Sequence, residues 1–282
     1  MKDLYVLIGF DVEHDAEPFS QTSEGVKRGI PLILDILDCL DIRCTFNILG
    51  CIIDEHLDLF KHIQQCGHEL GCHSYDHEVL AFMDDEDIYS QVQRATSAIE
   101  KKLGIRPVTF RAPYLLSNTY TVKTLNEFHY LVDSSYPLAH YKTQVLPYHP
   151  SESNWLKKGR LDVLEAPVSA DPSIQDPERS DLWPLWRTIG VKDTMQKIEH
   201  LLNKQKESSR MNIITFYLHP WEFIELENMG LEIPEDHQEK ILKGTGNHAV
   251  SNFKEILVWL QGRKNATFLP MNEFRPIWEE QT

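Results

Sequence analysis

The chain begins with the apolar run LYVLIGF at residues 4–10, and the polar run DVEHD at residues 11–15 follows it directly. A short apolar run that ends in polar residues is typical of a buried strand in a parallel sheet. Similar runs recur along the chain and alternate with segments whose apolar residues repeat at helical spacing. Strands that alternate with helices predict parallel βαβ units, and a chain of such units closes into a barrel or part of one.

The periodicity predicts where these elements lie. We expect strands at residues 4–10, 43–48, 69–73, 108–111, 130–133, 163–168, 212–219 and 266–269, and helices at residues 25–40, 57–66, 84–103, 120–128, 192–206 and 251–263. The least regular stretch is 137–186, where a long loop region of functional importance or high mobility is expected. Because no linker divides the chain, we predict an α/β fold of one domain over residues 1–282, a distorted or incomplete (β/α) barrel of about seven strands.

The composition narrows the class of protein. A net charge of −15 over 282 residues argues against nucleic acid and against an anionic membrane as partners. No stretch approaches the roughly 18 apolar residues of a membrane span. The amino terminus does not have the pattern of a signal peptide, and the five cysteines contain no CxxC spacing. We therefore expect reduced cysteines and a cytoplasmic location.

Polar residues with catalytic chemistry follow several of the predicted strands. Reactive groups of a βα barrel lie where strands end and the following loops begin. A spacing of four would place His73 and His77 on one face of a helix, although the run at 69–73 is typical of a strand that presents His73 at its end. In either arrangement, two imidazoles aimed at one point can hold a divalent metal. Other strand ends carry Asp11 with Glu13, the run RAPY at 111–114, DSS at 133–135 and LHPWE at 218–222.

The order of these motifs resembles the polysaccharide deacetylase family, which is carbohydrate esterase family 4 with its NodB homology domain. That family has DD or DxD, then H[ST]xxH, RxP[YFW], a strand that contains Asp, and LxH. Residues 11–13, 73–77, 111–114, 133–135 and 218–219 match these in order, the last without its x, and the resemblance covers roughly residues 4–270. The acidic residue at 13 and the HPWE ending resemble the peptidoglycan-deacetylase-like and allantoinase-like cytosolic branch.

The resemblance implies a metal-dependent hydrolase. It assigns the metal to Glu13, His73 and His77, and three protein ligands leave a position open for water and substrate. The implied cofactor is a divalent cation, with zinc as the first choice and cobalt, nickel, iron or manganese as alternatives. Where the family usually has Asp, this chain has Glu13, so His14 and Asp15 are alternative ligands.

The other polar residues at the predicted strand ends are expected to act in amide hydrolysis. Asp11 is expected to be the general base, Arg111 to hold it ionised and oriented, and His219 to be the general acid. The backbone N–H of Tyr114 is expected to help bind the oxyanion, and Trp221 to contact the substrate.

Three functions are open at this point. The first is removal of an N-acyl group, acetyl above all, from an N-acylated sugar or glycan precursor. The second is hydrolysis of a cyclic amide or ureide, as in the allantoinase-like relatives. The third is an inactive carbohydrate-binding barrel. The resemblance also implies association into a homo-oligomer.

Overall fold

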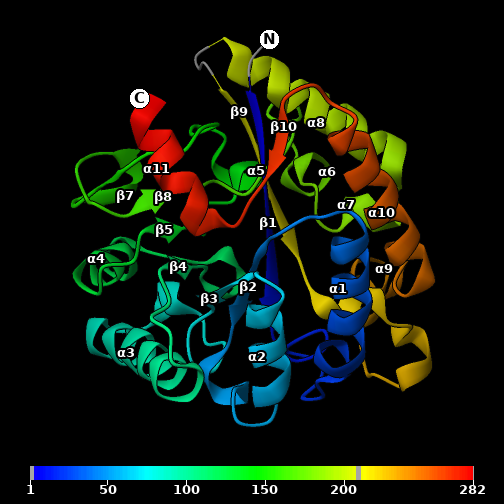
Figure 1. The fold of residues 1–282 in the computed structure, drawn as a ribbon, viewed down its shortest axis with the longest axis horizontal. Helices are drawn as coiled ribbons and strands as arrows, with labels where there is room; N and C mark the ends of the chain where they lie inside the picture. Colours follow the sequence, from blue (N-terminus) through cyan, green and yellow to red (C-terminus); the bar gives the residue numbers. More distant parts are fainter. Residues whose placement is uncertain (1–2, 208–210, 282) are drawn as a thin grey trace.

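The fold is built around a curved sheet of eight parallel strands (Figure 1). The computed structural model describes residues 3–207 and 211–281. The strands are β1 (Asp3–Val12), β2 (Thr45–Ile48), β3 (Glu69–Cys72), β4 (Thr109–Phe110), β5 (Val132–Asp133), β8 (Leu164–Glu165), β9 (Met211–Leu218) and β10 (Ala266–Phe268). Their order is β10-β1-β2-β3-β4-β5-β8, and β9 also pairs with β1.

The long strand β1 organises the sheet. Residues 3–10 of β1 pair with β9, so one edge of β1 is occupied along almost its whole length. The other edge is shared, because residues 4–6 pair with β10 and residues 9–12 pair with β2. Beyond β8 the sheet curls back toward β9, where the Ser169 N–H donates to the Thr215 carbonyl at 3.0 Å. The carboxyl ends of the strands are thereby gathered on one rim.

Helices cover the outside of the sheet (Figure 1). The α-helices are α1 (Ile30–Cys39), α2 (Leu57–Gln65), α3 (Asp85–Leu103), α4 (Thr119–Glu127), α5 (Leu138–Tyr141), α6 (Pro177–Ser180), α7 (Leu185–Thr188), α8 (Val191–Lys206), α9 (Glu235–Leu242), α10 (Asn247–Gln261) and α11 (Met271–Gln281). Shorter helical turns are η1 (Gly25–Gly29), η2 (Gly50–Ile52), η3 (Leu80–Phe82), η4 (Pro113–Leu115), η5 (Pro220–Phe223) and η6 (Leu226–Met229).

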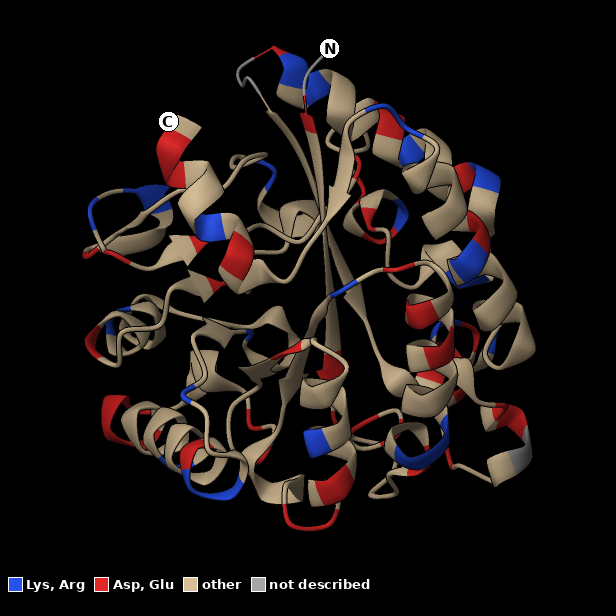
Figure 2. Ribbon diagram, in the orientation of Figure 1, with Lys and Arg blue, Asp and Glu red and all other residues tan. Residues whose placement is uncertain are grey.

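Helix α3 illustrates why these segments form where they do. Its apolar stripe of Ile88, Val92, Ala95 and Ile99 is fully buried, as the helical spacing predicts. The helix begins with acidic residues in its first turn and ends at Gly104, whose φ of 70° suits a left-handed C-cap. Charged residues are spread over the helices around the sheet, so the acidic residues are not concentrated on one element (Figure 2).

The predicted α/β fold is confirmed, with differences in detail. The strand expected over 163–168 is restricted to Leu164–Glu165. The irregular stretch 137–186 contains a separate hairpin of β6 (Pro150–Ser151) and β7 (Asn154–Lys158), together with α5 and α6. Helices α9 and α11 were not predicted; α11 has Pro276 within it, and proline argues locally against a helix. In the parts that the structure describes, no helix is long and apolar enough to cross a membrane.

Candidate metal centre

The strand ends bring the predicted rim residues together. Asp11 lies near the end of β1, Glu13 just beyond it, His73 after β3, Arg111 after β4 and His219 after β9. These five residues are at most 5% exposed. Parallel strands place their carboxyl ends on one edge, which is why residues more than 200 positions apart meet here.

His73 and His77 lie in a loop, so the helical placement considered for this pair is wrong. The chain leaves β3 through Ser74, whose φ is 70°, and His77 has a φ of 63°. The turn is fixed from outside: the Ser74 hydroxyl donates to Gln91 Oε1 at 3.2 Å, and the Gly50 N–H donates to the Ser74 carbonyl at 3.0 Å. Two left-handed residues turn the backbone back on itself, and the two rings meet with centroids 5.1 Å apart.

Glu13, His73 and His77 form a cluster of ligand type. One ligand atom from each lies within 4.8 Å of the others. The Glu13 Oε2 atom is 3.4 Å from His73 Nε2 and 2.7 Å from His77 Nε2. The Nδ1 atom of His73 is 2.8 Å from the Arg111 carbonyl, so the proton belongs on Nδ1 and the Nε2 lone pair faces the cluster.

The donor atoms of this cluster fit a divalent cation. His73 Nε2 and Asp11 Oδ2 are buried and have no hydrogen-bond partner, and His77 Nε2 makes no aligned hydrogen bond although it lies 2.7 Å from Glu13 Oε2. Buried polar atoms are rarely left without a partner, so converging atoms with unused bonding capacity are suited to hold a cation. Two imidazoles and a carboxylate are a ligand set that suits zinc and similar cations.

The electrostatics of the cluster agree with this interpretation. Burial opposes ionisation of Glu13, but the facing His77 and His219 outweigh it and lower its pKa well below the usual value. Burial also disfavours a charged His77, yet Glu13 and Glu17 raise the pKa of this imidazole to about 10. The cluster therefore attracts positive charge, which a proton supplies in the absence of a metal.

Only one of the two carboxylate oxygens of Asp11 accepts hydrogen bonds from the protein. Its Oδ1 atom accepts from Arg111 Nη1 at 3.0 Å and from Asn47 Nδ2 at 2.9 Å. Its Oδ2 atom has no such partner and lies 3.7 Å from His73 Nε2. Arg111 is fully buried and also donates to the Ser134 carbonyl at 2.9 Å, so its position is fixed. Gly9 makes room for it, since a Cβ there would lie 2.6 Å from the guanidinium.

His219 is enclosed by aromatic rings and backed by a carboxylate. The Trp221 ring stacks on it at 4.8 Å, and the Tyr217 and Trp183 rings lie edge-on at 4.6 and 5.3 Å. His219 Nε2 is 3.7 Å from Glu13 Oε1, while Nδ1 is 3.6 Å from Glu222 Oε2. Burial lowers the pKa of His219, but Glu13 and Glu222 outweigh it and raise the pKa above its ordinary value.

Tyr114 and Trp221 also lie beside the cluster. Tyr114 has a φ of 58° in the turn after β4, and its ring centroid is 4.5 Å from that of His77. Trp221 is 2% exposed, and its indole N–H donates to Glu13 Oε1 at 3.3 Å. The alternatives to Glu13 point elsewhere: Asp15 accepts from the Gly25 N–H at 2.7 Å, and His14 Nδ1 is 3.3 Å from Glu17 Oε2.

Three supporting residues were not predicted from the sequence. Asn47 is a polar residue inside the buried strand β2, which is the only local sign of its role. Glu17 Oε2 is 3.4 Å from His77 Nδ1, and its spacing of four from Glu13 is not distinctive. Glu222 is fully buried and accepts from Arg187 Nε at 2.7 Å and from Trp183 Nε1 at 2.8 Å. Both of these donors lie far from Glu222 in sequence.

Known proteins resemble parts of this chain in sequence. Residues 9–132 match the polysaccharide deacetylase family model. The chain is 32% identical over 84 residues to peptidoglycan-N-acetylglucosamine deacetylase PgdA of Listeria monocytogenes, which is 30% of this chain and 18% of that protein. It is 33% identical over 112 residues to chitin deacetylase 1 of Saccharomyces cerevisiae, covering 40% and 36% of the two chains. These matches span well under two thirds of either relative.

Solved structures resemble the whole chain. A Mycobacterium smegmatis protein described as a polysaccharide deacetylase superposes with a TM-score of 0.69 at 22% identity, covering 99% of this chain and 91% of that one. PuuE allantoinase gives the same TM-score and coverage at 14% identity. At these identities the likeness concerns the fold. Residues 9–132 thus resemble the polysaccharide deacetylase family in sequence, and the whole chain shares the fold of these solved structures.

Proposed function

We propose that the protein is a metal-dependent amide hydrolase that removes an N-acyl group, acetyl above all, from an N-acylated sugar or glycan precursor. The observation that carries the proposal is the buried cluster of Glu13, His73 and His77, beside an Asp11 oxygen with no hydrogen-bond partner. A ligand set, a free carboxylate oxygen and a histidine on one rim are the groups that amide hydrolysis requires.

Glu13, His73 and His77 would hold the metal. A bound divalent cation supplies Lewis acidity, which polarises a carbonyl and lowers the pKa of water. Zinc is our first choice because two imidazoles and one carboxylate suit it, and cobalt, nickel, iron and manganese are alternatives. Glu13 is favoured over His14 and Asp15 because it alone of the three faces both histidines.

Asp11 would be the general base. Arg111 and Asn47 occupy its Oδ1 atom and fix the orientation of the carboxylate, which leaves Oδ2 free to take the proton of an attacking water. Arg111 would thus act through Asp11 as a positioning residue. The backbone N–H of Tyr114 would face the oxyanion that develops as the water adds to the carbonyl carbon.

His219 would be the general acid. Its Nδ1 atom faces Glu222, so Nε2 is the atom that faces the centre and can deliver a proton to the departing amine. With this proton the carbon–nitrogen bond breaks, and a carboxylate and a free amine result. Trp221 stacks on the imidazole and would hold it in place beside the substrate.

The burial of the centre favours a small substrate over a polymer. All five rim residues are at most 5% exposed, and a long glycan requires an open groove. The charge of −15 also disfavours an anionic wall polymer. The same burial favours the second candidate, hydrolysis of a small cyclic amide or ureide, in which the amine stays tethered to the product.

We further propose that residues 1–282 act as one catalytic domain, that the protein is cytoplasmic, and that it forms a homo-oligomer. The five cysteines are free, which supports a reducing compartment. Cell fractionation and light scattering test the last two points.

The test is acetate release from N-acetylglucosamine and its dimer, with and without a chelator, alongside metal analysis of the purified protein. We expect chelation and His73→Ala to abolish release. His62→Ala, which changes an exposed histidine on α2, is the matched control and should leave release unchanged. If acetate release persists both in the presence of chelator and in His73→Ala, the proposal is overturned. If the protein hydrolyses allantoin but none of the N-acetylated sugars, the second candidate is supported. If the purified protein contains no metal and turns over no substrate, it is an inactive barrel.

A further inference from the structure

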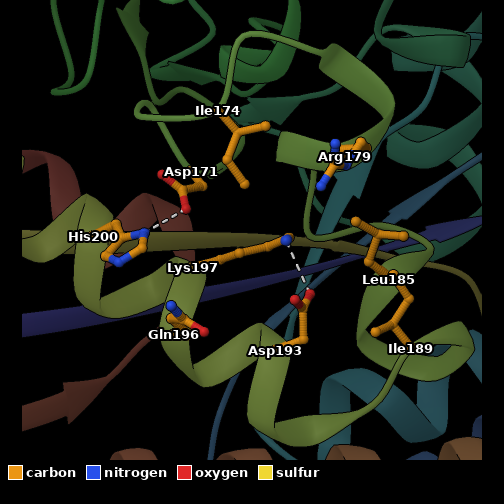
Figure 3. A pocket seen from close by; sticks show the side chains of 9 residues that line it. All are labelled: Asp171, Ile174, Arg179, Leu185, Ile189, Asp193, Gln196, Lys197 and His200. Carbon is orange, nitrogen blue, oxygen red and sulfur yellow. Dashed lines mark hydrogen bonds and ion pairs between the residues drawn. The ribbon is translucent and has the colours of Figure 1, made fainter.

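A cavity lies between α8, α7 and the segment 171–179, away from the metal centre. It measures about 180 Å³, and Figure 3 shows the side chains around it. None of its lining residues belongs to the metal cluster. A cavity of this size holds several water molecules, which suits a small ligand.

The floor of the cavity holds an ion pair with unused bonding capacity. Lys197 is 5% exposed, and its Nζ lies 2.9 Å from Asp193 Oδ2. Asp193 Oδ2 is itself buried and has no aligned hydrogen bond in the described structure. An ammonium has three donors, and buried donors are normally satisfied, so both groups retain capacity toward the cavity.

A second cation lines the same space. Figure 3 shows the Arg179 side chain directed toward the region of the Lys197 ammonium. Among the residues that the structure describes, no ion pair or hydrogen bond of its guanidinium is recorded. The neighbouring Asp171 is different, because His200 Nδ1 at 2.7 Å and the Ser173 hydroxyl at 2.6 Å already satisfy it. Two cations and one available carboxylate therefore face the cavity.

Three aliphatic residues also line the cavity, together with the polar Gln196. Leu185 and Ile189 line one side of the cavity in the view of Figure 3, and Ile174 is drawn beside Asp171. Ile189 is 61% exposed, which is unusual for a large apolar side chain. An exposed apolar wall beside fixed charges is the composition of a site for a small amphipathic molecule.

We propose that this cavity binds a free aliphatic α-amino acid as a zwitterion. The α-carboxylate lies between Lys197 and Arg179, the α-ammonium meets Asp193 Oδ2, and the side chain packs on Ile174, Leu185 and Ile189. The Lys197 ammonium occupies one side of Asp193 Oδ2, so a plain anion would leave the remaining lone pair of this oxygen without a donor. A plain amine would face two cations. Only a ligand with both charges matches the three charged groups, and only one with an aliphatic side chain covers the wall.

The test measures binding of L-leucine to the full chain by calorimetry and by the shift of the thermal unfolding midpoint. Two analogues each remove one charge: 4-methylpentanoate lacks the ammonium, and 3-methylbutylamine lacks the carboxylate. Glycine lacks the side chain. We expect L-leucine to bind, and each of the three probes to bind at least about tenfold more weakly. A hydrogen bond to a charged group accounts for about that factor in the two analogues, and the buried aliphatic side chain accounts for it in glycine.

Variants locate the binding to this cavity. Arg179→Gln changes an exposed side chain, should fold normally, and should weaken L-leucine binding about tenfold or more. The double variant Lys197→Met with Asp193→Asn removes both partners of the ion pair together and should abolish binding. Lys192→Gln, an exposed residue on the same helix α8, is the matched control and should bind as the parent does.

The outcomes separate this proposal from the proposed function. Absence of L-leucine binding at millimolar concentration, or equal binding of 4-methylpentanoate, overturns it. Binding that is unchanged in Arg179→Gln also overturns it. Because no lining residue belongs to the metal cluster, His73→Ala should bind L-leucine normally, and a catalytically inactive protein can still pass this test.

Discussion

Strand β3 has a buried polar residue at each of its two ends, and the two ends differ in one respect. At the start of β3, Glu69 accepts from the hydroxyls of Thr45 and Thr109 at 2.7 and 2.6 Å, and from the Asn272 N–H at 3.2 Å. Just beyond its other end, His73 has a buried Nε2 atom with no hydrogen-bond partner. The nearby Asp11 Oδ2 atom is also buried and also lacks a hydrogen-bond partner. Both ends are buried and both carry charge-bearing groups.

This difference in hydrogen bonding distinguishes a residue that stabilises the fold from one that can bind a ligand. A buried polar group whose bonds are all made stabilises the fold and has nothing left to offer a ligand. A buried group with unused bonding capacity costs stability unless something else binds it. Burial or charge alone would not have distinguished Glu69 from His73, whereas the count of satisfied bonds does.

The largest expected effect is a loss of kcat when Asp11, at the carboxyl end of β1, is changed. Asp11→Asn keeps the size of the side chain but removes the base, so kcat should fall by about 10²–10⁴ while the metal content is retained. Glu69→Gln, at the opposite end of β3, is the matched change of carboxylate to amide and should leave kcat close to that of the parent. Steady-state kinetics with metal analysis of both variants provides the measurement, and an equal loss of kcat in the two would break the comparison.

A smaller effect, on metal affinity, is expected for a residue that contacts a metal ligand but does not itself bind the metal. Glu17 Oε2 lies 3.4 Å from His77 Nδ1 and so orients this ring from behind. Glu17→Gln should weaken metal affinity by about 10–100-fold, as loss of such a partner typically does. Competition between the protein and a chromogenic chelator measures this affinity. Glu55→Gln, an exposed carboxylate paired with Lys27, is the control, and similar affinities in the two variants would contradict the assignment.

The smallest effect concerns stability and its pH dependence. Burial raises the pKa of Glu69, although hydrogen bonds from Thr109 and Thr45 oppose the rise. The contribution of Glu69 to stability is therefore complete below its ordinary pKa of 4.5 and is lost as the pH rises through the folded-state value. Glu69→Gln does not titrate, so it should cost about 1–3 kcal/mol at about pH 4 and less at about pH 7. Urea unfolding of both proteins gives these differences, and a cost that grows with pH would contradict the raised pKa.

Much of the fold could be predicted from local patterns. The apolar stripe of α3 and the glycine after it determine that helix by themselves. The strands β4, β5 and β8 are two residues long, and such short elements leave little periodicity to detect. Helix α11 was missed because Pro276 within it argues against a helix locally, while packing of Phe274 and Trp278 on the core outweighs that preference.

The sequence by itself determined the order of the rim motifs and the kinds of residue at the strand ends, because each motif is local and each strand end can be recognised from its apolar run. Only the tertiary structure decided which atoms of those residues remain free. Asn47 and Glu17 reach Asp11 and His77 through contacts between separate segments, and the distant Arg187 and Trp183 hold Glu222 beside its neighbour His219. A left-handed turn at Ser74 brings the two histidines together. The identity of a ligand group is a property of the chain, but its unused bonding capacity depends on every neighbour that the fold places around it.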